Sequence, residues 1–134
     1  MNRFSSYATL GLAALAGGCA MSADPGPSPA AADELARALE GRVAGAPVSC
    51  VRLTELGGNR SAGDAIVFDG RGSRIYVNRP AGGCPSLNFG RALRTRPTTG
   101  QLCRNDIVTV FDPATGTDYG GCGLGDFIPY DRPG

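Results

Sequence analysis

Cysteines are the residues of this chain whose spacing says most about chemistry. Four of the five lie far apart in the second part of the sequence, at Cys50, Cys84, Cys103 and Cys122. None of them forms the close Cys–Cys pair of a zinc site or of a thiol redox motif, and the chain has no histidine. In an exported chain, an even number of such cysteines favours disulfides. The sequence therefore predicts two disulfide bonds, no metal site and no cofactor.

Four cysteines allow three pairings, and we expect Cys50–Cys122 together with Cys84–Cys103. Cys50 lies on the first predicted strand and Cys122 on the last, and closure of a small barrel would bring those strands together. Cys84 and Cys103 bracket a turn and a weak strand. By the loop-entropy estimate, the shorter bridge would contribute about 3 kcal/mol and the longer one somewhat more. A small domain gains much from such bridges because its single core is limited.

Carboxylates are the remaining candidates for catalysis. The absence of histidine excludes imidazole acid–base chemistry and the Ser–His and Cys–His nucleophile pairs. Most aspartates fall at expected turns or strand ends, where a carboxylate caps backbone N–H groups. Nothing in their spacing selects a pair of hydrolase carboxylates. We therefore name no catalytic residue and expect no enzyme; the alternative is a periplasmic enzyme or enzyme inhibitor without a recognisable catalytic motif.

Arginines are distributed unevenly along the chain. Seven of them and no acidic residue lie between Gly70 and Arg104, whereas five aspartates and a single arginine lie in residues 106–134. Two interpretations stay open. The arginine segment and the aspartate segment could pair across a sheet. Alternatively, some of the guanidinium groups could form an anion-binding face.

The predicted anion-binding residues are Arg74, Arg94 and Arg96. Side chains alternate along a strand, so Arg74 should share the solvent face with Tyr76, opposite Ile75. By the same reasoning Arg94 and Arg96 should point outward together. Such a face would bind an anionic lipid or another anionic envelope polymer. All 13 basic residues are arginine and the net charge is only +1, so nothing indicates nucleic acid binding.

The first 18 residues resemble a lipoprotein-type signal peptide. Arg3 precedes an apolar run over residues 8–16, which is too short to span a bilayer. The run ends in Leu15-Ala16-Gly17-Gly18-Cys19, similar to a bacterial lipobox, in which small residues precede an acylated cysteine. We expect lipidation of Cys19, which would attach the protein to a membrane. Ordinary signal-peptidase cleavage near the same point is the alternative.

Localisation follows from that signal. The residue after Cys19 is alanine rather than aspartate, which by resemblance to the Gram-negative sorting pattern indicates the periplasmic face of the outer membrane. A soluble periplasmic protein is the alternative. Residues 19–32 would be the lipid anchor and a tether rich in Pro and Ala, because repeated prolines favour an extended chain.

Residues 33–134 are expected to form a single small β-rich domain. An apolar repeat of four predicts one short helix over residues 33–44. Alternating and β-branched segments predict strands over residues 48–53, 65–69, 74–78, 92–96 and 106–112, with an irregular closing strand at the end. The fold class predicted is mainly β: a small antiparallel sheet or partial barrel of about six strands, with one short N-terminal helix and two disulfides.

The order of these features resembles an uncharacterised family of small cysteine-containing proteobacterial envelope proteins. The resemblance covers roughly residues 48–127 and depends on cysteine spacings and short apolar runs. Its motifs are Cys50 on an opening strand, the hairpin, Cys84-Pro85 followed by Leu87 and Phe89, Leu102-Cys103 before a β-branched strand, and Cys122. It implies an envelope location and supplies no catalytic residues. The function we expect is that of a lipid-anchored envelope protein with a binding or structural role.

Overall fold

The computed structural model describes residues 17–18, 29–84, 86–87 and 91–134. Within them the chain forms one α-helix, one 3-10 helix and ten strands. Their bounds in chain order are α1 Pro29–Leu39, β1 Val43–Ala44, β2 Cys50–Arg52, η1 Leu53–Glu55, β3 Asn59–Ala62, β4 Ala65–Asp69, β5 Ile75–Asn78, β6 Ala92–Arg94, β7 Gln101–Cys103, β8 Ile107–Phe111, β9 Asp118–Gly123 and β10 Phe127–Asp131.

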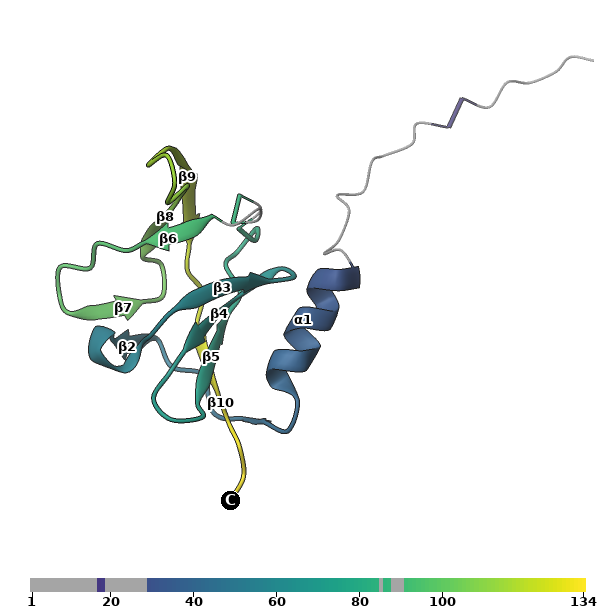
Figure 1. Ribbon diagram of the computed structural model, residues 1–134, viewed down its shortest axis with the longest axis vertical. Coiled ribbons are helices and arrows are strands. Elements are labelled where there is room, and N and C mark those ends of the chain that lie inside the picture. Colours follow the sequence, from purple (N-terminus) through teal and green to yellow (C-terminus); the bar gives the residue numbers. More distant parts are fainter. Residues whose placement is uncertain (1–16, 19–28, 85, 88–90) are drawn as a thin grey trace, which may run out of the picture.

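Three antiparallel sheets surround one core. The strand order is β1-β10-β5-β4-β3 in the largest sheet, β6-β8-β9 in the second and β2-β7 in the third. Strand β9 runs directly towards β10, so one C-terminal segment belongs to both larger sheets, and β6 lies near β3 on the other side (Figure 1). The predicted mainly β fold with one helix and two disulfides is confirmed. The strands are more numerous than expected because the predicted closing segment forms two strands, β9 and β10, and because β1, β3 and β7 are short strands that the sequence pattern did not indicate.

The inward faces of the sheets form the main core. Its buried members come from all three sheets: Val51, Ile66, Phe68, Tyr76, Leu87, Leu93, Leu102, Val108, Val110, Cys122, Leu124 and Phe127. On β4, Ile66 and Phe68 point into this core while Val67 points to the opposite face, as the two-residue period of a strand requires. Both faces of β4 are therefore buried.

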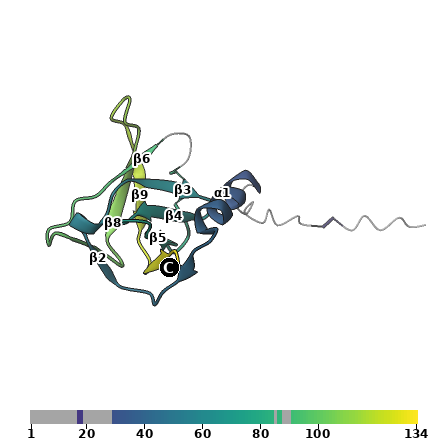
Figure 2. The same cartoon turned by 60° about the horizontal axis from the view of Figure 1, so that its bottom comes forward.

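Helix α1 covers the outer face of the five-stranded sheet (Figure 2). Leu35 and Leu39 pack there against Val67 and Ile75, which confirms the predicted apolar face of the helix. The predicted bounds, residues 33–44, are wrong. The helix begins at Pro29, where a missing N–H is harmless in the first turn. It ends at Leu39, and Val43 lies exposed on β1.

A corner between β9 and β10 allows the C-terminal segment to change sheets. Asn78 is fully buried, and its side-chain amide donates to the Gly125 carbonyl (2.7 Å) and accepts from the Gly125 N–H (2.9 Å). A Cβ atom on residue 125 would lie 2.6 Å from the carbonyl oxygen of Arg79. Glycine is therefore required at this corner, and Asn78 satisfies both of its backbone groups.

The disulfides are Cys50–Cys103 and Cys84–Cys122, so the predicted pairing Cys50–Cys122 with Cys84–Cys103 is wrong. Strand β2 leaves the last strand after a bridge at Val48 and pairs with β7, where Cys50 lies directly opposite Cys103. The strand pairing therefore does not bring the first of these cysteines to the last one.

The second disulfide follows from the register of β5 and β10. Asn78 is the partner of Phe127 in that antiparallel pair. Cys84 follows Asn78 by six positions and Cys122 precedes Phe127 by five, so the two segments that carry these cysteines reach the same end of the sheet. The bridges close loops with sequence separations of 53 and 38 residues. By the loop-entropy estimate each contributes about 4 kcal/mol.

Tryptic mapping without reductant tests this connectivity, because each of the four cysteines falls in its own peptide. Trypsin cleaves after arginine unless proline follows, which gives residues 43–52, 75–91, 95–104 and 105–134. We expect 43–52 linked to 95–104, and 75–91 linked to 105–134, each pair separating on reduction. A mass corresponding to 43–52 linked to 105–134 would contradict the strand pairing described here.

Candidate functional site

A polar cleft of about 390 Å³ lies where three parts of the chain meet. The β4–β5 hairpin loop, the short helix η1 and the end of β10 each contribute side chains to it. We call it the arginine cleft; its lining residues are Glu55, Arg71, Ser73, Arg74, Tyr76, Asp131 and Arg132. It brings three guanidinium groups and two carboxylates into one depression, and no other described pocket combines as many charges.

The hairpin loop sets the spacing of Arg71 and Arg74. The Gly70 N–H donates to the Arg74 carbonyl (2.9 Å), and the Arg74 N–H donates to the Arg71 carbonyl (3.2 Å). A Cβ atom on residue 70 would lie 2.9 Å from the Arg74 carbonyl oxygen and 3.2 Å from the Tyr76 ring. The glycine thus allows the neck of the loop to close. Arg71 Nε donates to the Thr54 carbonyl (3.3 Å), which ties the loop to η1.

The end of β10 adds the third wall. Tyr130 pairs with Ile75, so the following residue, Asp131, lies beside Arg74. Arg74 grips this carboxylate with two parallel hydrogen bonds, Nε to Oδ1 and Nη2 to Oδ2, both of 2.7 Å. The guanidinium of Arg74 lowers the pKa of Asp131 below its usual value, chiefly through these bonds. The same bonds raise the pKa of Arg74 above its usual value.

The remaining charges of the cleft are not paired with one another. Within the part of the chain that the structure describes, the side chains of Glu55 and Arg132 make no hydrogen bond or ion pair, and Arg71 bonds only a backbone carbonyl. Once Arg74 and Asp131 neutralise each other, the cleft keeps two guanidinium groups and one carboxylate. It can therefore bind a small anion, with one acidic group close by.

The structure does not bring Arg74, Arg94 and Arg96 together, so the predicted anion-binding cluster is wrong. Arg94 lies on β6 in the other large sheet, pairs with Asp118 (3.0 Å) and stacks on the Phe111 ring (4.3 Å to its centroid). Arg96 follows β6 and lines a separate pocket. The two segments lie in different sheets because the chain changes sheets between β5 and β6.

The pairing interpretation of the arginine segment holds for three of its members. Arg74, Arg94 and Arg104 each form an ion pair with an aspartate of the C-terminal segment, namely Asp131, Asp118 and Asp126. The orientation expected for Tyr76 is wrong: it is only 5% exposed and packs edge-on against Phe127. Both faces of β5 are buried, because α1 covers the face that the sequence pattern assigned to the core.

Four charged members of the cleft were missed by the sequence interpretation: Glu55, Arg71, Asp131 and Arg132. Arg71 belongs to the arginine-rich segment, and the predicted hairpin could have placed it beside Arg74. Arg132 lies beyond the last strand, and only the β5–β10 register shows that it approaches the hairpin. No local pattern marks Glu55.

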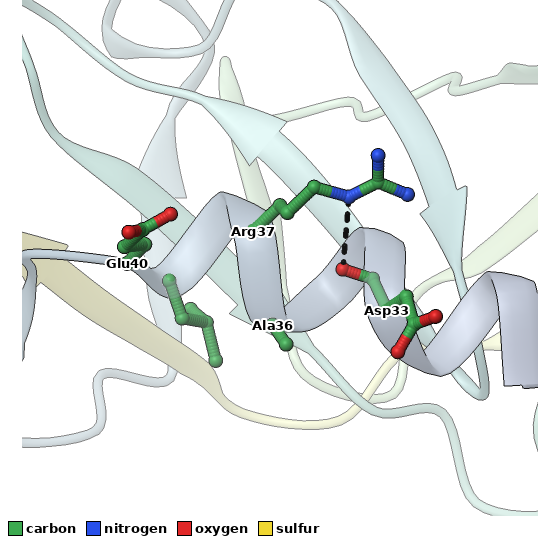
Figure 3. Close-up of a pocket in the computed structure, with 5 residues that line it drawn as sticks. Asp33, Ala36, Arg37 and Glu40 are labelled. Atoms are coloured by element: carbon green, nitrogen blue, oxygen red, sulfur yellow. Dashed lines mark hydrogen bonds between the residues drawn. The ribbon is translucent and has the colours of Figure 1, made fainter.

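A larger depression runs along α1 and is not a candidate site (Figure 3). Its lining residues come from α1 and the residue that directly follows it: Asp33, Ala36, Arg37, Leu39 and Glu40. Arg37 points along the helix and donates from Nε to the Asp33 carbonyl (3.3 Å), which is a local helix contact. No second element supplies a group that could hold a ligand there.

Two further predictions concern a metal site and the membrane. Among residues 17–18, 29–84, 86–87 and 91–134, no group of three acidic or cysteine side chains could hold a metal ion. No helix in those ranges has the length and apolar character needed to cross a membrane. Cys19, the predicted lipidation site, lies outside the described residues.

Comparison with known proteins gives no relative: no family model, no curated protein sequence and no solved structure matches this chain. The resemblance to small envelope proteins stays a prediction from the cysteine spacing. The candidate site is therefore argued from its own geometry.

The ion pair at the cleft predicts a specific pH dependence. Because the folded pKa of Asp131 is lowered, its contribution to stability is fully present above the unfolded value of roughly 4. That contribution is lost as the pH falls through the folded pKa. Arg74→Gln should therefore unfold at lower urea than the wild type at pH 7, and this difference should shrink at acidic pH. A carboxyl-carbon NMR titration should move the Asp131 midpoint upward in the variant.

Arg52→Gln is the matched control, because Arg52 is exposed on β2 and makes no side-chain ion pair within the described residues. It should leave both the Asp131 midpoint and the pH dependence unchanged. An Asp131 midpoint that is the same in wild type and Arg74→Gln would show that the ion pair does not form in solution.

Proposed function

We propose that this protein is a lipid-anchored cell-envelope protein whose domain binds anionic groups of envelope components in the arginine cleft. One observation carries the proposal. Three guanidinium groups line a single cleft, and only one of them has a carboxylate partner among the described residues. The other ion-paired arginines of the domain lie singly on its surface.

The chemistry of arginine suits this role. A guanidinium presents several N–H donors in a plane that matches phosphate and carboxylate oxygens. Arg74 is held in place by Asp131 through Nε and Nη2. Arg71 is held by the Thr54 carbonyl through Nε alone. Two of the three guanidinium groups are thus positioned before a ligand arrives, which reduces the entropy lost on binding.

The anchor supports an envelope target. Acylation at Cys19 would leave residues 19–28 between the lipid and α1, a distance of at most about 35 Å when fully extended. A domain held so near the membrane meets phosphate-bearing lipids and polymers at high local concentration. Even a weak site for anions could then be occupied.

The binding half of the proposal is tested by phosphate titration of the full chain, followed by arginine Nε–H NMR signals. We expect the Arg71, Arg74 and Arg132 signals to shift together, with affinity falling as salt rises because the cleft is open to solvent. Replacing Arg71 and Arg132 together with glutamine should weaken binding at least fivefold. Arg52→Gln combined with Arg96→Gln removes the same charge elsewhere and should have little effect. Equal weakening by both double variants would show that binding depends only on net charge, and would contradict a specific site in the cleft.

The anchoring half is tested at Cys19. Wild-type protein produced in a Gram-negative host should fractionate with membranes and carry the mass of acyl chains on Cys19. Cys19→Ser should move the protein to the periplasmic fraction or leave its signal peptide uncleaved. A mature wild-type chain that starts at Asp24 without lipid would contradict the anchor and leave the cleft untouched.

A further inference from the structure

We propose that the arginine cleft takes a zwitterionic ligand, a phosphate ester that bears a primary ammonium group, as in phosphoethanolamine. This inference rests on the proposed anion-binding function and names its ligand. It follows from the charges that stay unpaired in the cleft and from the presence of only one aromatic side chain among the residues that line it.

The unpaired charges of the cleft have both signs. Arg74 and Asp131 neutralise each other through two hydrogen bonds of 2.7 Å. Arg71 and Arg132 then remain to attract an anion, and Glu55 remains as a carboxylate without a partner in the described residues. A ligand with negative charge alone would satisfy the guanidinium groups and bring its charge close to Glu55. A ligand that also carries a cation satisfies all three.

The placement of Glu55 explains why one ligand can reach both signs. Arg71 donates to the carbonyl of Thr54, the residue next to Glu55, so the two side chains start from adjoining parts of the cleft. No ion pair joins them. The Arg71 guanidinium and the Glu55 carboxylate therefore lie in the same part of the cleft without neutralising each other. A ligand whose ammonium group is two carbons from a phosphate oxygen needs this arrangement.

The lining favours a primary ammonium over a quaternary one. Proteins bind quaternary ammonium groups in cages of several aromatic faces. Tyr76 is the sole aromatic residue that lines the described cleft; it is 5% exposed, and the Arg74 guanidinium lies 5.9 Å from its ring centroid. A primary ammonium instead offers three N–H donors, which a carboxylate such as Glu55 accepts. A volume of about 390 Å³ lies within the usual range for small-molecule sites.

The test compares three soluble phosphate diesters by calorimetry on the full chain carrying Cys19→Ser. They are glycerophosphoethanolamine, glycerophosphocholine and dimethyl phosphate. We expect the first to bind at least fivefold more tightly than the other two. Glu55→Gln should abolish this preference without weakening dimethyl phosphate, whereas Arg132→Gln should weaken all three. Glu34→Gln, which removes an exposed acid from helix α1 outside the cleft, should change none of them.

Each outcome distinguishes this inference from the function on which it rests. Equal affinity for the three diesters, or a preference that survives Glu55→Gln, overturns the zwitterionic ligand and leaves an anion site. Absence of binding by all three overturns both.

Vesicles identify the source of the group. Glu55-dependent retention on phosphatidylethanolamine–phosphatidylcholine vesicles, but not on phosphatidylcholine alone, supports a lipid headgroup. Binding of the soluble ester without vesicle retention supports the same chemistry on a non-lipid component.

Discussion

The side-chain amide of Asn78 bonds both backbone groups of Gly125, and the arrangement of the two large sheets depends on this contact. The C-terminal segment must leave one sheet at β9 and enter the other at β10, and the corner between them exposes peptide groups that no strand can satisfy. A buried peptide group without a partner destabilises the fold by about 1–3 kcal/mol. Asn78 satisfies two such groups at once, the N–H and the carbonyl of Gly125. An apolar residue of similar size at position 78 would leave both without a partner.

The register fixed at this corner has consequences at both ends of β10. At one end, alignment of Asn78 with Phe127 brings Cys84 and Cys122 within disulfide distance. At the other end, the same alignment places Asp131 beside Arg74 and carries Arg132 to the hairpin. A shift of one residue would turn every side chain of β10 to the opposite face and dismantle the arginine cleft. The disulfide and the candidate binding site are therefore two products of one strand pairing.

Local sequence patterns predicted the elements well where local physics decides them. The β-branched runs of β4 and β5 and the glycines between them identify the hairpin, and the spacing of Leu35 and Leu39 identifies the helix face. The two disulfides agree with the prediction made from the number and spacing of the cysteines. Their pairing does not, because it depends on β2 leaving β10 for β7 after Val48, a long-range choice.

The candidate site was likewise predictable only in the part that local sequence patterns determine. Arg74 was identified from its segment, but its supposed partners Arg94 and Arg96 belong to a different sheet. The expected orientation of Tyr76 is wrong because a strand with the helix on one side and the main core on the other has no solvent face. The true neighbours, Arg71, Arg132 and Glu55, come from a loop, a terminus and a 3-10 turn, where no periodicity reports side-chain direction.

Hydrogen exchange of the Asn78 side-chain amide is the sharpest test of the corner between β9 and β10. We expect its two N–H protons to exchange as slowly as the amides of the buried strands and to show cross-relaxation with the Gly125 N–H. Exchange as fast as that of a solvent-exposed asparagine, with no cross-relaxation to Gly125, would contradict the corner. The register that assembles the arginine cleft would then lose its basis.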